Sequence, residues 1–254
     1  MRIAISGSAN LGKSTLIKDF LQEWPMYGYE VTSYRNIVAE KQLPHSKQTT
    51  KKTQKAILEY MVDSLKQFNK DDKVIFDRCP LDNLVYSMWG MSQDNNDIDE
   101  EFIDECIPIV REALENLDII FFIPITKFNK IQVEDNGNRE TDKNYIKEID
   151  NFFKVLQRHY HEHPQENPFF PRDNSPALIE VFGKPEERLE MIKLYLDNEG
   201  DLIGGDGSST DLFNPENLDM MEKLLESQGI AHKEELQLKD QIEAFKDLHE
   251  KSKK

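Results

Sequence analysis

Cysteine is scarce in this chain, with only Cys79 and Cys106 among 254 residues and no CxxC spacing. This excludes a disulfide framework and a cysteine-based zinc knuckle, and it favours a reducing compartment. Long apolar segments are missing too, since no run approaches the ~18 residues that a membrane-spanning helix needs. The N-terminus also lacks the basic and apolar segments of a secretory signal. We therefore expect a cytoplasmic protein that is not inserted in a membrane.

Basic residues are outnumbered, because 32 Lys and Arg against 48 Asp and Glu give a net charge of −16. This balance argues against broad electrostatic attraction to DNA, RNA or an anionic membrane, although it allows a local basic groove. Hydrophobic residues make up 38% of the chain, which can supply a core and argues against global disorder. The length suits one α/β domain with additions, or one domain and a tail.

Five short segments have the composition of β-strands and alternate with segments of helical periodicity. Three of them, VIFD, IIFFIP and ALIEVF, are nearly continuously apolar, which is typical of parallel strands covered on both faces. The alternation predicts an α/β fold, a three-layer sandwich around a five-stranded parallel sheet with ligands at the carboxyl ends of its strands. The predicted strands are residues 2–6, 30–34, 73–77, 118–124 and 177–182.

Helical patterns fill the intervals between these strands. An apolar stripe predicts a helix over residues 53–68, and Pro108 is expected to bend or to start the helix before the fourth strand. Another helix is expected over residues 186–196, and the Gly/Asp/Ser-rich stretch that follows is typical of a linker. We predict three parts, which are a domain of residues 1–196, a linker of residues 197–214 and a helical tail of residues 215–254.

The stretch GSANLGKS lies between the first predicted strand and a helical segment. Its glycines permit a tight turn and the close approach of phosphate oxygens, and its backbone amides form an anion nest at a helix N-terminus. In such a loop Lys13 reaches the β- and γ-phosphates and the Ser14 hydroxyl binds Mg²⁺. We therefore predict ATP and Mg²⁺ as ligands. The predicted nucleotide-binding residues are Gly7, Ser8, Ala9, Asn10, Leu11, Gly12, Lys13, Ser14 and Thr15.

The run KVIFDRCPLDN ends a predicted strand with Asp77 and Arg78. A carboxylate at this edge of the sheet can hold Mg²⁺ through water, or it can accept the proton of an attacking hydroxyl. Arg78 could clamp a substrate oxygen or phosphate. The alternative is that Asp77 only caps a helix that begins near Pro80. We interpret Asp82, one turn further on, as a cap or a surface residue.

Several motifs together resemble the P-loop kinase-like NTPase family: GSANLGKS, the strand end VIFDR, VEDNGNRETDKNYIKEIDNFF and IEVFGKPEERLEMI. That family includes the bacterial nicotinamide riboside kinase domain and many phage-encoded AAA-type ATPases. The Asp-Arg strand end is more distantly similar to deoxynucleoside and thymidylate kinases. The resemblance covers residues 1–196, does not extend into the tail, and implies a P-loop NTPase fold with a lid at about residues 127–165.

The resemblance also implies two sets of site residues. In the lid, Arg139 would stabilise charge on the transferring phosphoryl group, and closure would exclude water. The alternative there is a charged hairpin before a capped helix. After the last strand, Gly183 would let the backbone approach adenine, and Arg188 would stack on the base or pack beneath the loop. A surface salt bridge with Glu186 or Glu187 is the alternative for Arg188.

The segment after the second predicted strand is locally basic, with Arg35 and five lysines opposed by Glu40 alone. At the ligand edge of the sheet it could receive an anionic acceptor, although most of its lysines fit a solvated surface equally. Arg35 is our candidate substrate residue because it follows a predicted strand directly. Tyr86 and Trp89 could stack on a base or belong to a helix core.

These observations favour a kinase that moves the γ-phosphoryl group of ATP to a nucleoside- or nucleotide-like acceptor. Lys13 would hold the donor, Asp77 would orient or deprotonate the acceptor, and Arg139 would close over both. One alternative is a phage-type kinase of hydroxymethylated bases in DNA, against which the net charge counts. Another is an ATPase switch with a protein partner. The C-terminal helix could dock on its own domain, form a homo-oligomer or recruit that partner.

Overall fold

The computed structural model describes residues 1–29, 33–126, 141–162 and 167–203. Contacts divide the chain into two compact units. The first joins Met1–Ile125 to Ile131–Val181, and the second joins Thr126–Lys130 to Phe182–Lys254. The predicted boundaries at residues 196 and 214 stay predictions, because the second of them lies outside the described residues.

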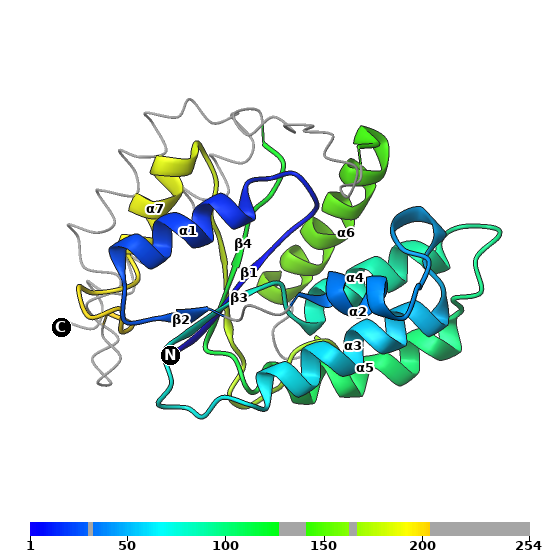
Figure 1. Ribbon diagram of the computed structural model, residues 1–254, viewed down its shortest axis with the longest axis horizontal. Coiled ribbons are helices and arrows are strands. Elements are labelled where there is room, and N and C mark those ends of the chain that lie inside the picture. The colour runs from blue at the N-terminus through cyan, green and yellow to red at the C-terminus, as the bar shows by residue number, and fades with distance from the viewer. Residues whose placement is uncertain (30–32, 127–140, 163–166, 204–254) are drawn as a thin grey trace. The chain divides into compact units, whose positions relative to one another are not determined.

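A five-stranded, fully parallel sheet forms the centre of the first unit, as the sequence predicts (Figure 1). Its strands are β1 (Arg2–Ser6), β2 (Gly28–Tyr29), β3 (Val74–Asp77), β4 (Ile119–Phe122) and β5 (Ala177–Glu180). The strand order is β2-β3-β1-β4-β5, so β1 lies between β3 and β4. Chain connections therefore leave in opposite directions on the two sides of β1, which places a ligand crevice at its carboxyl end.

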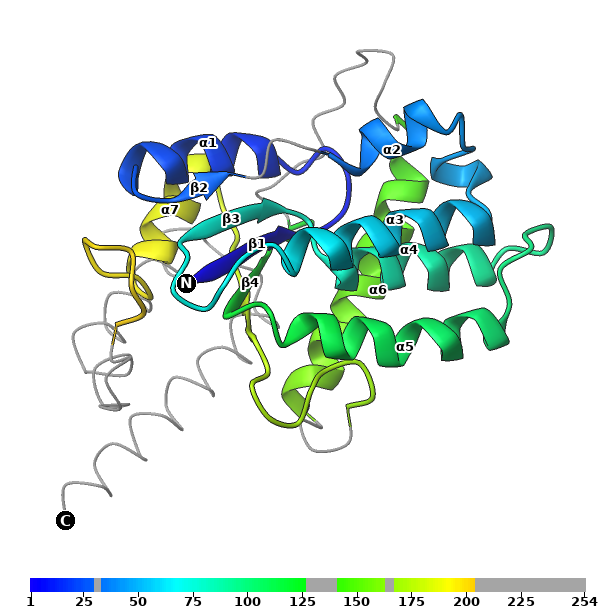
Figure 2. The ribbon, with the colours of Figure 1, turned by 60° about the horizontal axis from the view of Figure 1, so that its bottom comes forward.

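Helices cover both faces of this sheet, with α1 on one face and α3, α4, α5 and α6 on the other (Figures 1 and 2). The helices of the first unit are α1 (Lys13–Glu23), α2 (Tyr34–Glu40), α3 (Lys51–Leu65), α4 (Pro80–Met91), α5 (Glu100–Leu114) and α6 (Lys143–Glu162), and η1 (Ser46–Gln48) is a short 3₁₀ turn. The main core packs Ala4, Phe76 and Phe122 of the sheet against apolar side chains of α3 to α6. Neighbouring strand positions point to the opposite face, where α1 contacts β1 and β3.

The second strand differs from its prediction. The sequence predicts residues 30–34, whereas the structure has β2 at Gly28–Tyr29 and begins α2 at Tyr34. Ser33 caps this helix, because its Oγ accepts a hydrogen bond from Arg35 N at 3.3 Å. Serine is a preferred N-cap residue, because its side-chain oxygen accepts a hydrogen bond from a backbone N–H in the first turn of a helix. Residues 30–32 lie outside the described part of the chain.

Helix boundaries differ from the predictions by a few residues. The predicted helix 53–68 is α3, which begins earlier because Thr50 accepts a hydrogen bond from Thr53 N at 3.3 Å. Pro108 lies inside α5 and does not start it.

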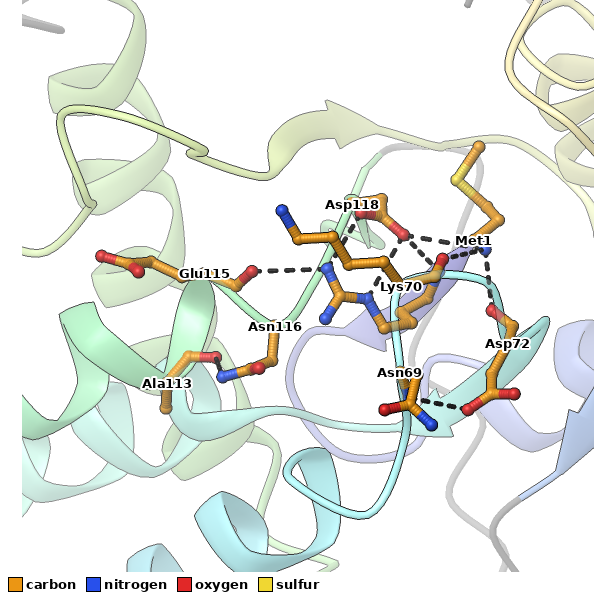
Figure 3. A network of polar contacts seen from close by, with 9 residues as sticks. Met1, Asn69, Lys70, Asp72, Ala113, Glu115, Asn116 and Asp118 are labelled. Carbon is orange, nitrogen blue, oxygen red and sulfur yellow. Dashed lines mark hydrogen bonds and ion pairs between the residues drawn. The ribbon is translucent and has the colours of Figure 1, made fainter.

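Polar contacts tie together the amino-terminal ends of three strands (Figure 3). The Met1 amine donates to Asp72 O, just before β3, at 2.7 Å. Arg2 donates to Asp118, just before β4, through its backbone N at 2.6 Å and Nη2 at 3.1 Å. This network lies at the end of β1 opposite to the predicted ligand edge.

The second unit contains α7 (Pro185–Lys193), where the sequence predicts a helix over 186–196. After it, Leu196 and Leu202 form an antiparallel bridge around a turn. None of the helices in the described part of the chain is both long and apolar enough to cross a membrane.

Candidate active site

The phosphate loop leaves β1 at Ser6 and enters α1 at Lys13. Gly7 has a φ of 133°, and a Cβ there would lie 2.6 Å from the backbone oxygen of Ile123, so only glycine fits this position. Gly12 caps α1 in the left-handed region with a φ of 80°. The first backbone N–H groups of α1 have no partner inside the helix and can bind an anion.

Lys13 is the buried cation of this loop. Its Nζ donates to the backbone oxygen of Ser8 at 2.5 Å, inside the turn. Burial, and after it the positive charge of Arg78, lowers the pKa of Lys13 to about 7. The loop therefore holds a cation that an anionic ligand would stabilise strongly.

Asp77 ends β3 directly beside the loop, because the parallel register pairs it with Ile5 of β1. Among the described residues, its Oδ1 atom is buried without a hydrogen-bond partner. Buried polar atoms are rarely left unsatisfied, and such exceptions concentrate at functional sites. Asp77 therefore has an oxygen available to a ligand.

Arg78 and Asp82 fill the space between Asp77 and the loop. Their side chains are buried, and Nη1 of Arg78 donates to Oδ1 of Asp82 at 2.8 Å. The guanidinium lies over the rings of Tyr86, at 5.2 Å, and Tyr34, at 5.9 Å. Burial raises the pKa of Tyr86 to about 12, so the ring that faces Arg78 is neutral at pH 7. Asp82 is thus a cap, as predicted, but not a surface residue.

A cavity of about 660 Å³ adjoins these groups and is lined by loop residues 9–15 and by Asp77. The rest of its lining comes from α2, α3, α4, α6, the segment between α2 and α3, and Arg78 in the turn before α4. Three tyrosines, Tyr34, Tyr86 and Tyr145, contribute to this wall. The cavity is large enough for a ligand of nucleoside size beside the phosphates.

Two buried amides, Gln54 of α3 and Asn83 of α4, belong to the same wall. Nδ2 of Asn83 donates to the backbone oxygen of Gln54 at 2.9 Å and to its Oε1 at 2.6 Å. A backbone carbonyl can only accept, which fixes the orientation of the Asn83 amide. Nε2 of Gln54 then donates to Thr49 Oγ1 at 2.7 Å. Oδ1 of Asn83 is left buried without a partner among the described residues.

Comparison with known families gives a match to the AAA domain over residues 2–167, which is more than half of the chain and includes the loop and the cavity. The chain belongs to the AAA domain family. Its phosphate loop and five-stranded parallel sheet are those of a P-loop NTPase with a kinase-like fold. No curated protein matches this AAA domain protein.

Solved structures support the fold of this AAA domain protein. Two structures of deoxyadenosine kinase from M. mycoides, one with dCMP and dCDP and one with dATP, align with a TM-score of 0.51. Their sequence identities are 18% and 19%, and each alignment covers 76% of this chain and 96% of the kinase. NadR in complex with NR aligns at 14% identity over 71% of this chain and 45% of that chain, with a TM-score of 0.49 that is too low to support an inference.

Arg35 lies at the site, but on a different element from the one that the sequence predicts. Arg35 lines the cavity from the first turn of α2 and does not follow a strand. None of the five lysines of its segment lines the cavity. Lys47 pairs with Asp142 at the start of α6, and Lys51 pairs with Asp99 at 2.5 Å. The basic segment therefore contributes one cation to this wall.

Gly183 and Arg188, expected at the adenine side, lie in the second unit, and Arg139, expected in the lid, lies outside the described residues. In the second unit, Gly183 has a φ of 91°, and its backbone oxygen accepts a hydrogen bond from Nε of Arg188 at 3.0 Å. Arg188 is only 2% exposed and burial lowers its pKa to about 10. Arg188 is therefore not a surface residue, and its hydrogen bond to Gly183 fits the expectation that it packs beneath the loop.

Ser14 and Asp77 suit Mg²⁺, which prefers oxygen ligands and keeps several waters. Ser14 lies exposed on the cavity wall, and Asp77 has its unpartnered oxygen. No cluster of three or more His, Cys, Asp or Glu side chains in the described part of the chain could hold a metal by itself. Phosphate oxygens and water would therefore have to complete the shell of this ion.

Sequence reasoning missed several residues of the site, among them Tyr34, Gln54, Asn83 and Tyr145. Asn83 could have been found, because it lies in the first turns of a helix that starts at the ligand edge of the sheet. Gln54 carries no such signal, since its place in the wall depends on how α3 packs against α4. Of the two aromatics considered, Tyr86 lines the cavity, whereas Trp89 is a core residue whose Nε1 donates to Glu148 at 2.8 Å.

Proposed function

We propose that this AAA domain protein is an ATP-dependent kinase of a nucleoside- or nucleotide-like acceptor. One observation carries the proposal, which is that the phosphate loop, the unpartnered carboxylate of Asp77 and a wall of tyrosines and amides line one cavity. An enzyme that only hydrolysed ATP would need room for water beside the phosphates. Here the additional wall offers stacking surfaces and hydrogen-bonding groups to a second molecule.

The donor would bind along residues 7–15, with the β- and γ-phosphates at the loop amides and at Lys13. Gly183 and Arg188 remain candidates for the adenine side. Mg²⁺ bound by Ser14, with Asp77 reaching it through water, would neutralise charge on the phosphates. Arg139 stays a candidate for the same task from the lid.

The acceptor would lie against Tyr34, Tyr86 and Tyr145, with Arg35 near any negative charge it carries. Because Oδ1 of Asn83 is an acceptor held in a fixed direction, the ligand should present an N–H group there. Nucleobases carry such groups on their hydrogen-bonding edges. The deoxyadenosine kinase structures hold dCMP, dCDP and dATP, which makes nucleosides and nucleotides the first acceptors to try.

In the proposed step, the acceptor hydroxyl oxygen forms a bond to the γ-phosphorus of ATP. The bond from that phosphorus to the bridging oxygen breaks, and ADP leaves with the electron pair. Asp77 receives the hydroxyl proton as general base, which its position at a strand end beside the loop allows. Lys13 stabilises the charge that gathers on the phosphates.

The test is ADP formation in the presence of a panel of nucleosides and nucleoside monophosphates. We expect slow turnover with Mg-ATP alone and at least a tenfold rise with one member of the panel, whose phosphorylated product is identified by mass spectrometry. Asp77→Asn should lower kcat far more than the affinity for ATP. Turnover that ignores every acceptor but rises with a protein would support an ATPase switch and overturn the kinase proposal.

A further inference from the structure

Asp82 makes more hydrogen bonds than a helix cap requires. Its Oδ2 accepts from Cys79 N at 3.1 Å, which is the capping contact at the start of α4. The same oxygen accepts from Ser6 Oγ at 2.7 Å, and Oδ1 accepts from Gly7 N at 3.3 Å and from Nη1 of Arg78 at 2.8 Å. Asp82 is 1% exposed. Two of its donors thus come from β1 and the phosphate loop, more than 70 residues away in the sequence.

Arg78 completes a ring of contacts around Gly7. The Nη1 atom that donates to Asp82 also donates to the backbone oxygen of Gly7 at 3.0 Å. Both backbone polar groups of Gly7 are therefore bound, one by Arg78 in the turn after β3 and the other by Asp82 in the first turn of α4. On a third side, the backbone of Ile123 lies so close that no Cβ fits. The first glycine of the loop is fixed against β3 and β4 together.

This ring includes the residue that follows Asp77 directly. Arg78 has a φ of 84°, a left-handed conformation that costs a non-glycine residue about 1 kcal/mol or more. The buried guanidinium makes charge-assisted hydrogen bonds to Asp82, and these hold the turn in that conformation. Because Asp77 and Arg78 are neighbours in the chain, whatever fixes Arg78 also fixes the backbone from which the carboxylate of Asp77 projects.

We propose that Asp82 is a positioning residue that fixes the distance between the phosphate loop and Asp77. Through Gly7 it sets the place of the transferring phosphoryl group, and through Arg78 it sets the place of the proposed base. The inference rests on the proposed function, since it assigns Asp82 a part in phosphoryl transfer. Arg78 acts inside this ring as well, because its Nη1 holds Gly7, while its side chain also lines the cavity and stays a candidate substrate clamp.

We predict that a substitution of Asp82 changes kcat much more than the KM for Mg-ATP. Asp82→Asn keeps the size of the side chain but removes its charge and places an N–H₂ group among donors. We expect kcat to fall ten- to a hundredfold, because misplacing reacting groups by a fraction of an ångström to an ångström has effects of this size. The KM for Mg-ATP should change less than threefold, since the loop amides and Lys13 remain.

A matched control comes from the opposite end of β1. Asp118→Asn removes a carboxylate that also accepts from an arginine and a backbone N–H (Figure 3). It should lower thermal stability without changing kcat or KM. Ser6→Ala removes only one contact of Asp82, and it should fold and lower kcat three- to tenfold. It therefore tests the proposal even if Asp82→Asn does not fold.

Turnover is measured both with the best acceptor and with Mg-ATP alone. A wild-type protein that hydrolyses ATP but phosphorylates no acceptor rejects the kinase function, and the positioning role is then judged on hydrolysis. Folded Asp82→Asn or Ser6→Ala protein with wild-type kcat would overturn the positioning role. A loss of kcat in Asp118→Asn equal to that in Asp82→Asn would do so as well, because stability alone would then explain both.

Discussion

Lys13 shows at the scale of one residue how burial prepares a site for an anion. Its pKa is lowered to about 7, first by burial and then by Arg78, so in the free protein part of the population has a neutral amine at pH 7. Phosphate oxygens beside the amine stabilise its charged form and raise that pKa again. Binding of Mg-ATP should therefore take up a proton above pH 7.

The sign of the resulting pH dependence follows from this shift. Below pH 7 Lys13 is already charged, whereas above pH 7 binding must also protonate it, so affinity should fall by up to tenfold per pH unit between pH 7 and 9. Calorimetry at several pH values, in buffers of different ionisation enthalpy, measures both the affinity and the proton uptake. Lys13→Ala should lose the uptake together with most of the affinity, and the exposed Lys18→Ala should keep both. If the Lys13→Ala variant still takes up a proton when it binds Mg-ATP, then another group receives that proton.

At the scale of elements, the contact between α3 and α4 shapes the acceptor wall. Asn83 of α4 donates to the backbone and the side chain of Gln54 in α3, which leaves its own Oδ1 facing no described partner. Asn83→Leu, which keeps the size and removes the amide, should raise the KM for the preferred acceptor about tenfold or more and leave the KM for Mg-ATP unchanged. Steady-state kinetics with each substrate varied in turn measure both values. An unchanged acceptor KM would show that no hydrogen bond forms at this amide.

The helices and strands also show how much of this structure can be predicted from the sequence. The central strands and the phosphate loop could be predicted because a buried parallel strand and a glycine-bounded anion loop each have a local pattern. The start of α2 could not, since residues 30–34 (EVTSY) have the composition of a short strand, whereas Ser33 caps a helix. The pairing of Gln54 with Asn83 could not be predicted for a different reason, although the position of Asn83 near the ligand edge could. Their pairing depends on helix packing, which no spacing within either helix encodes.

At the scale of the whole molecule, the charge of −16 bears on the choice of acceptor. A base in duplex DNA would bring a dense array of phosphates toward an acidic protein, at a cost that low salt increases. We expect that duplex DNA, with or without hydroxymethylated bases, neither binds at 50 mM salt nor raises ADP formation. A gel-shift assay and the turnover assay measure these outcomes. Salt-sensitive binding with transfer of phosphate to DNA would support the phage-type alternative.

The place of Gly7 against Ile123 has a consequence for synthesis on the ribosome. β1 is made first, yet its partners β3 and β4 end more than 70 and more than 110 residues later, and closing such distant contacts is slow. The phosphate loop is synthesised early, but the backbone of Ile123 can pack against it only after residue 123 has emerged from the exit tunnel. A shorter nascent chain lacks the wall that the backbone of Ile123 provides, so we expect this loop to bind ATP only after that residue has emerged.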